Sequence, residues 1–161
     1  MKTSRSCPFT AAILGFALVF AIAATVSIRA LAAPGAPAES HLQLMQPAEL
    51  LQLLKAGQEP VIIQVGFRTL YEQAHIPASE YVGPASQAQG LQALHKRVQG
   101  LPRQRLIVLY CGCCPWSHCP NVQPAYKKLR DMGYRNVKVL YITNNFGADW
   151  VDKGYPVSRG Q

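Results

Sequence analysis

The chain alternates between stretches whose apolar residues have a helical spacing and short stretches that are apolar almost throughout. The first helical stretch begins at Pro47 and ends before Gly57, which places proline in the first turn and glycine at the stop. Its apolar positions, which predict an amphipathic helix, are Ala48, Leu50, Leu51, Leu53 and Leu54. Residues 61–65 follow; they are β-branched and nearly all apolar, which predicts a strand covered on both faces.

The same alternation continues to the end of the chain. The further predicted helices cover residues 68–74, 86–98, 120–131 and 146–152, and the further strands cover 80–82, 105–110 and 136–142. Strands that alternate with helices predict an α/β fold with a mainly parallel central sheet and helices on both faces. In such sheets, ligands bind at the carboxyl ends of the strands.

The first 32 residues predict an export signal. Lys2 and Arg5 precede an uncharged run over 6–28, and residues 30–32 offer an A-x-A cleavage site. The run is longer than the roughly 7–15 residues of an ordinary signal. It is close to the roughly 20 residues that span a bilayer, so an uncleaved membrane anchor stays open as the alternative. Both interpretations place the rest of the chain in the periplasm or another extracytoplasmic space, because positive residues remain on the inner side.

The chain after the signal consists of a linker and one predicted domain. Residues 33–45 are rich in Ala, Pro and Gly without an apolar period, which predicts a linker before a domain over 46–158. The formal charge is +8, and Lys2, Arg5 and Arg29 contribute three of its 16 basic residues. The other basic side chains only mildly exceed the 8 acidic ones and lack interleaved aromatic residues, so we expect no nucleic-acid surface.

Four of the five cysteines lie within residues 111–119, between the predicted central strand and the next helix. A cysteine at such a junction lies near the positive end of the helix dipole and near unpaired backbone N–H groups, which favour its thiolate. We expect this of Cys111. A thiolate accepts sulfane sulfur, attacks disulfides and binds soft metal ions, so its position alone leaves these three chemistries open.

The neighbouring thiols define the alternatives to sulfur chemistry. In an oxidising compartment, thiols this close tend to pair. Cys111 and Cys114 form a C-x-x-C pair, and Cys114 can also pair with Cys119. A bond between the adjacent Cys113 and Cys114 is strained and is the least favoured. For zinc or Cu(I), the soft ligands in the loop are Cys111, Cys114, Cys119 and His118.

An ordered set of motifs over residues 46–157 resembles a single-domain rhodanese. Besides Tyr71 and Trp150, the motifs are Val61-Ile-Ile-Gln-Val-Gly66, Ala74-His-Ile-Pro-Ala78, Leu106-Ile-Val-Leu-Tyr-Cys-Gly112, Gly133-Tyr-Arg-Asn-Val137 and Gly154-Tyr-Pro-Val157. The resemblance implies a three-layer α/β domain. It also implies that Cys111, which ends the central strand, carries a persulfide.

The chain departs from the family pattern in three places. The usual Asp-x-Arg after the first strand is Gln64-Val-Gly66, and the Gly-Gly before the last helix is Asn144-Asn145. The interval from Cys111 to the helix end at Gly133-Tyr134 is about five residues longer than in the common pattern, and the loop contains no arginine of the kind that would favour an anionic sulfur donor. The cysteine loop is therefore the least typical part of the chain.

The residues and the resemblance together predict an exported domain that performs sulfane-sulfur (persulfide) transfer or related thiol chemistry at Cys111. The expected catalytic side chains are Cys111, Cys114, Cys119 and His118, and the expected substrate-binding loop residues are Gly112, Cys113, Trp116 and Ser117. We expect a monomer without a cofactor that meets a small sulfur donor and a thiol acceptor. It would contact the membrane only through an uncleaved N-terminal segment. The alternatives are a non-enzymatic module that binds a metal ion or a partner, and a thiol-disulfide redox protein.

Overall fold

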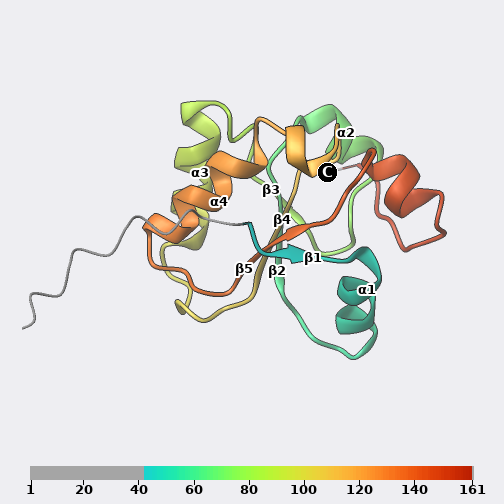
Figure 1. The fold of residues 1–161 in the computed structure, drawn as a ribbon, viewed down its shortest axis with the longest axis horizontal. Coiled ribbons are helices and arrows are strands. Elements are labelled where there is room, and N and C mark those ends of the chain that lie inside the picture. Colours follow the sequence, from blue (N-terminus) through green and yellow to red (C-terminus); the bar gives the residue numbers. More distant parts are fainter. Residues whose placement is uncertain (1–41, 161) are drawn as a thin grey trace, which may run out of the picture. The chain divides into compact units, whose positions relative to one another are not determined.

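The computed structural model describes residues 42–160, so the predicted export signal over 1–32 and most of the predicted linker lie outside the described residues. Within the described part, five strands form one sheet in the order β1-β5-β4-β2-β3, and every neighbouring pair is parallel. The strands are β1 (Leu44–Met45), β2 (Val61–Gln64), β3 (Glu80–Tyr81), β4 (Ile107–Tyr110) and β5 (Val137–Leu140) (Figure 1). The predicted α/β fold with a parallel central sheet is confirmed.

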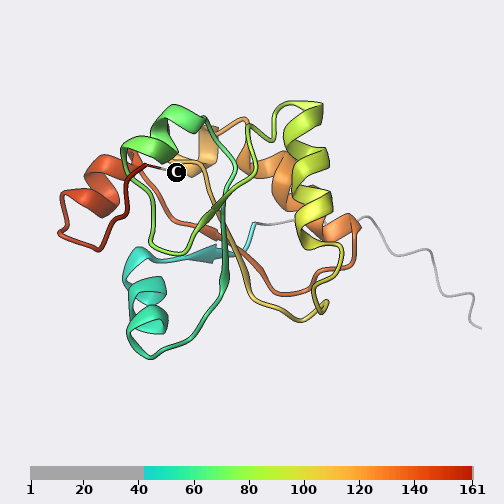
Figure 2. The same cartoon turned by 180° about the vertical axis from the view of Figure 1, so that it is seen from behind.

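Helices cover both faces of this sheet. They are α1 (Pro47–Lys55), α2 (Arg68–Gln73), α3 (Ala88–Val98), the short 3-10 helix η1 (Trp116–His118), α4 (Val122–Asp131) and the π-helical turn η2 (Gly147–Val151). Successive residues of β4 point to opposite faces. Ile107 and Leu109 pack in one core with α3 and α4, whereas Val108 and Tyr110 pack in a second core with α1 and η2. Figures 1 and 2 show α3 and α4 side by side and α1 apart from them.

The sheet begins earlier than the predicted linker allows. Residues 33–45 were expected to form a linker, but Leu44 and Met45 pair in parallel with β5. Backbone hydrogen bonds fix the pair, because the N–H of Val139 donates to the Gln43 oxygen and that of Tyr141 to the Met45 oxygen. Met45 is buried in the core. Two residues are too few to show the alternation of a strand in the sequence. Leu44 and Met45 form a strand because of their backbone hydrogen bonds with β5.

The region after β4 also differs from the predicted pattern. The helix expected from residue 120 begins at Val122, and the loop before it contains η1, which the apolar pattern does not predict. The helix expected over 146–152 is a single π-helical turn. No helix within residues 42–160 has both the length and the apolar character needed to cross a membrane.

Candidate active site

The cysteine loop leaves the carboxyl end of the central strand, and its thiols converge there. Cys111 directly follows β4 and is buried. Its Sγ lies 3.2 Å from the Sγ of Cys113, which lies 3.1 Å from the Sγ of Cys114. The Sγ atoms of Cys111, Cys113 and Cys119 all lie within 4.8 Å of one another. All four predicted loop cysteines therefore belong to one cluster of free thiols.

Cys119 occupies the place at the helix N-terminus that the sequence assigned to Cys111. The residue before a proline avoids helical backbone angles, and Cys119, which precedes Pro120, is extended at φ −78° and ψ 117°. Its sulfur thereby meets the start of α4, where backbone N–H groups lack helical partners. The Cys111 thiol, together with the backbone N–H groups of Asn121 and Val122, lowers the pKa of Cys119 to about 6 against the opposing effect of burial.

The pKa values of Cys111 and Cys114 are shifted in the opposite direction. Hydrogen bonding with Cys119 and burial raise the pKa of Cys111 well above its ordinary value. Burial raises the pKa of Cys114 to about 12, and the hydrogen bond with Cys113 is the next largest cause of the rise. The lowered pKa thus belongs to Cys119 and the raised pKa to Cys111, the reverse of the expectation, because the longer loop carries Cys119 to the helix N-terminus.

Three buried residues that were not assigned to the site hold Cys111 in place. Gln64 donates its Nε2 to the Cys111 oxygen at 2.9 Å and accepts the N–H of Gly66 at 3.1 Å. A Cβ on Gly66 would lie 2.8 Å from both the oxygen and the Sγ of Cys111, so the close approach requires glycine. Asn121 donates its Nδ2 to the Cys111 Sγ at 3.5 Å. In the sequence, only the departure from the Asp-x-Arg pattern indicated a special role for Gln64 and Gly66. No sequence pattern indicated the role of Asn121.

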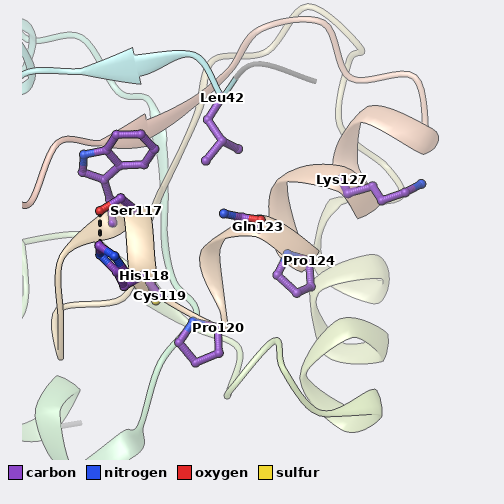
Figure 3. Close-up of a pocket in the computed structure, with 9 residues that line it drawn as sticks. Leu42, Ser117, His118, Cys119, Pro120, Gln123, Pro124 and Lys127 are labelled. Carbon is purple, nitrogen blue, oxygen red and sulfur yellow. Dashed lines mark hydrogen bonds between the residues drawn. The ribbon is translucent and has the colours of Figure 1, made fainter. Parts of the chain in front are cut away.

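Three of the remaining predicted loop residues, Trp116, Ser117 and His118, line a cavity of about 800 Å³. Figure 3 shows Ser117 and His118 joined by a hydrogen bond, which is 2.9 Å long between the Ser117 Oγ and the His118 Nδ1. Both side chains are exposed. Trp116 is partly buried; its backbone N–H donates to the Ile142 oxygen at 2.8 Å, and its ring contacts Tyr141. Cys119 opens toward this cavity, which the first turns of α4 complete.

A second cavity of about 360 Å³ meets the cluster at Cys111, Gly112 and Cys113. Its wall includes Gln64 and Phe146, and no charged side chain lines it. The two cavities share no lining residue. The thiol cluster therefore borders one cavity at Cys119 and the other at Cys111 and Cys113.

The four ligands expected for a metal ion are not brought together as one group. Among the described residues, the Sγ atoms close enough to share an ion are those of Cys111, Cys113 and Cys119. His118 is instead bonded to Ser117 at the exposed rim. A soft ion such as Cu(I) accepts a set of three thiolates, whereas structural zinc sites are almost always four-coordinate.

Comparisons with known proteins agree with this architecture. The sequence profile of the family described as the rhodanese-like domain matches residues 46–141. No curated protein matches the chain at a significant level.

Several solved structures share the fold. The BH2092 protein from Bacillus halodurans is 22% identical with a TM-score of 0.57, over 73% of this chain and 77% of that protein. A thiosulfate sulfurtransferase from Pseudomonas aeruginosa is 20% identical with a TM-score of 0.57, over 75% of this chain and 21% of that one. The anaerobic ergothioneine biosynthesis enzyme from Chlorobium limicola is 24% identical with a TM-score of 0.56, over 73% of this chain and 28% of that one. Identities this low establish a common fold alone.

Proposed function

Because this chain belongs to the family of rhodanese-like domains, we propose that it accepts sulfane sulfur as a persulfide in the loop 111–119 and hands it to a thiol. Family and thiol cluster together support sulfurtransferase-type or thiol chemistry in general. The observation that carries the specific proposal is the position of Cys119: its sulfur lies within 4.8 Å of that of Cys111, and its pKa is lowered to about 6 by Cys111 and by the N–H groups of Asn121 and Val122. A thiolate is the nucleophile that sulfur uptake requires.

Sulfur uptake is a single displacement. The Cys119 thiolate attacks the outer sulfur of a donor R–S–SH, a new S–S bond forms on Cys119, and the donor leaves as the thiolate RS⁻. The backbone N–H groups of Asn121 and Val122 stabilise the anionic sulfur before the attack. An acceptor thiolate then attacks the outer sulfur of the persulfide, and Cys119 departs again as a thiolate. No electron is gained or lost overall, because the sulfur atom moves between thiols.

Cys111 retains a role as the neighbouring thiol. It occupies the strand-end position at which the family carries its persulfide. Its sulfur lies within 4.8 Å of that of Cys119. We propose that sulfur taken up at Cys119 passes to Cys111, so that the second cavity receives it. Gln64 and Asn121 position Cys111 for this step through its oxygen and its sulfur.

We also propose that the domain works outside the cytoplasm as a monomer. The proposal rests on the basic residues, apolar run and A-x-A site of residues 1–32. Fractionation of the producing cell, followed by N-terminal sequencing, tests both export and cleavage. A full-length chain recovered only from the cytoplasm contradicts the proposal.

The decisive experiment measures the intact mass of the reduced chain after treatment with a sulfane-sulfur donor. Wild type is expected to gain the mass of one sulfur atom, and cyanide or a thiol is expected to remove it. Cys119→Ser should take up sulfur far more slowly, because it lacks the thiolate. Cys7→Ser, at the one cysteine outside the loop, is the matched control and should behave as wild type.

Two results would contradict the proposal in different ways. A wild-type chain that gains no removable sulfur from any donor refutes sulfur transfer. Normal uptake by Cys119→Ser together with loss in Cys111→Ser refutes the assignment of the nucleophile and returns it to Cys111.

A further inference from the structure

We propose that Cys111 and Cys113 form a redox pair that expels the carried sulfur as sulfide, which makes the domain a sulfane-sulfur reductase. The inference rests on the proposed function, since a persulfide must first form in the loop. The carried sulfur leaves as sulfide, and the reductant is a small thiol supplied from outside the chain.

The backbone at Gly112 creates this pair. Gly112 has φ +93°, in the left-handed region that glycine adopts at no steric cost. A Cβ at this position would lie 3.1 Å from the Cβ of Phe146, and the Phe146 N–H donates to the Gly112 oxygen at 3.0 Å. The side chains on either side of this turn converge, and the Sγ atoms of Cys111 and Cys113 lie 3.2 Å apart. A C-x-C pair is thus held in contact by a glycine turn.

Among the described residues, the two short sulfur–sulfur contacts favour Cys111–Cys113 as the disulfide pair. Cys113 also contacts Cys114 at 3.1 Å, but a disulfide between adjacent residues is strained. Within residues 42–160, no sulfur–sulfur hydrogen bond joins Cys111 to Cys114, the C-x-x-C pair expected from the sequence. The structure therefore replaces the expected C-x-x-C pair with a C-x-C pair.

Sulfur reaches this pair by transfer within the cluster. The Cys111 thiol attacks the outer sulfur of the Cys119 persulfide and loses its proton to water, which returns it to the R′–S⁻ released in uptake. Cys119 leaves as a thiolate, and the donors that lower its pKa also make it a good leaving group. The persulfide now lies on Cys111, beside Cys113.

Reduction follows in one displacement. The Cys113 sulfur attacks the Sγ of Cys111, the bond to the outer sulfur breaks, and the outer sulfur takes the electron pair and the Cys113 proton and leaves as H₂S. The sulfane sulfur is reduced to sulfide, while the sulfurs of Cys111 and Cys113 are oxidised to a disulfide. Two small thiols R–SH restore the dithiol and become R–S–S–R. The balanced sum is R′–S–SH + 2 R–SH → R′–SH + H₂S + R–S–S–R.

The second cavity provides the path for the reductant. Cys111 and Cys113 both line it, and its volume of about 360 Å³ is lined without a charged side chain. Cys113 is partly exposed, whereas Cys111 is buried. An incoming thiolate therefore meets the Cys113 sulfur of the disulfide. The sulfane donor reaches Cys119 from the other cavity, so the two reagents enter by separate routes.

A single turnover without added thiol tests the proposal. The reduced full-length chain receives one equivalent of an organic persulfide in the absence of oxygen, and released sulfide and intact mass are measured. Wild type is expected to release the sulfur as sulfide and to lose the mass of two hydrogen atoms. Peptide mapping is expected to place the disulfide between Cys111 and Cys113.

Variants separate this step from sulfur uptake. Cys113→Ser is expected to retain its persulfide and to release no sulfide, and Gly112→Ala, which keeps every thiol, is expected to accumulate persulfide as well. Cys114→Ser should still form the Cys111–Cys113 disulfide, and Cys7→Ser serves as the control for cysteine replacement. Circular dichroism establishes that each variant is folded.

The outcomes that overturn the proposal differ from those that overturn sulfur transfer. A wild-type chain that holds its persulfide without releasing sulfide overturns the reductase and leaves sulfur transfer standing. Sulfide release by folded Cys113→Ser at the wild-type rate does the same. If the chain takes up no sulfur, both proposals fall. Diamide oxidation of the reduced chain tests the disulfide pair separately from sulfur uptake. A disulfide mapped between other cysteines than Cys111 and Cys113 refutes the proposed redox pair.

Discussion

Asn121 is a fully buried polar side chain that ties the cysteine loop to the chain before α3. Its Oδ1 accepts the N–H of Ser86 at 2.9 Å, and its Nδ2 donates to the Cys111 Sγ at 3.5 Å. An asparagine in front of a helix usually caps it, but this one makes no capping bond. Its hydrogen bonds instead position the loop.

Asn121→Ala is expected to lower the free energy of unfolding by about 1–3 kcal/mol, because the fully buried side chain loses its hydrogen bonds with the Ser86 N–H and the Cys111 Sγ. Urea unfolding measures the change. Asn136→Ala is the matched control; its exposed amide donates to the Gln104 oxygen at 3.4 Å, and its loss should cost within about 0.5 kcal/mol. Equal losses in the two variants would contradict a special role for Asn121.

The Cys119 thiolate predicts a distinctive pH dependence. Its pKa of about 6 means that the reactive fraction rises as the pH increases through about 6 and is nearly constant above that range. The rate of Cys119 alkylation by iodoacetamide, followed by peptide mass, should show this inflection. Cys111→Ala removes the largest cause of the shift, so its inflection should move to higher pH. An inflection near the ordinary cysteine value of about 8.5 in wild type would contradict the assignment.

At the scale of elements, the late start of α4 decides which cysteine becomes the thiolate. The added loop residues fold into η1, Pro120 keeps Cys119 extended, and α4 begins only at Val122. The helix N-terminus thus lies beside Cys119, eight positions after Cys111. The helix dipole and the unpaired N–H groups act over about one helical turn. Because α4 starts this late, they lower the pKa of Cys119 and not that of Cys111.

The end of β2 is packed against the same loop. Gly66→Ala would place a Cβ 2.8 Å from the backbone oxygen of Cys111, and such overpacking is expected to destabilise the fold by about 1–3 kcal/mol. Gly100→Ala is the control, because nothing lies within 4 Å of its Cβ position. Thermal unfolding of both variants measures the difference. A Gly66→Ala domain as stable as Gly100→Ala would show that the loop can move away freely.

At the scale of the whole molecule, the charge of the two cavities bears on which sulfur donor the proposed function would use. Neither is lined by an arginine, and the one lysine, Lys127, bonds Asp131 at 2.7 Å. A dianion such as thiosulfate would lose its hydration without a charged partner in either cavity.

We therefore expect initial rates with an organic persulfide to exceed those with thiosulfate. Gln123→Arg, which places a guanidinium in the cavity at Cys119, should raise the thiosulfate rate. Gln104→Arg adds the same charge at an exposed position outside both cavities and should not. Thiosulfate turnover by wild type at the organic persulfide rate would contradict this account of specificity.

Much of the fold follows from local patterns. The apolar runs at β2, β4 and β5 and the amphipathic spacing of α1 predict those elements within a few residues. The ordered motifs predict the family that the profile match shows over residues 46–141. β1 could not be predicted, since two residues show no period and depend on β5 for their hydrogen bonds. The π-helical turn η2 likewise has no sequence pattern of its own.

The sequence by itself determined that the thiol chemistry lies in one loop, because four cysteines crowd the junction of the central strand and a helix. Only the tertiary structure decided which cysteine lies at the helix N-terminus and which pair is in contact. The N–H groups that lower the pKa of Cys119 and the glycine turn that joins Cys111 to Cys113 depend on backbone angles fixed by packing. Residue order specifies neighbours along the chain, whereas acidity and pairing depend on neighbours in space.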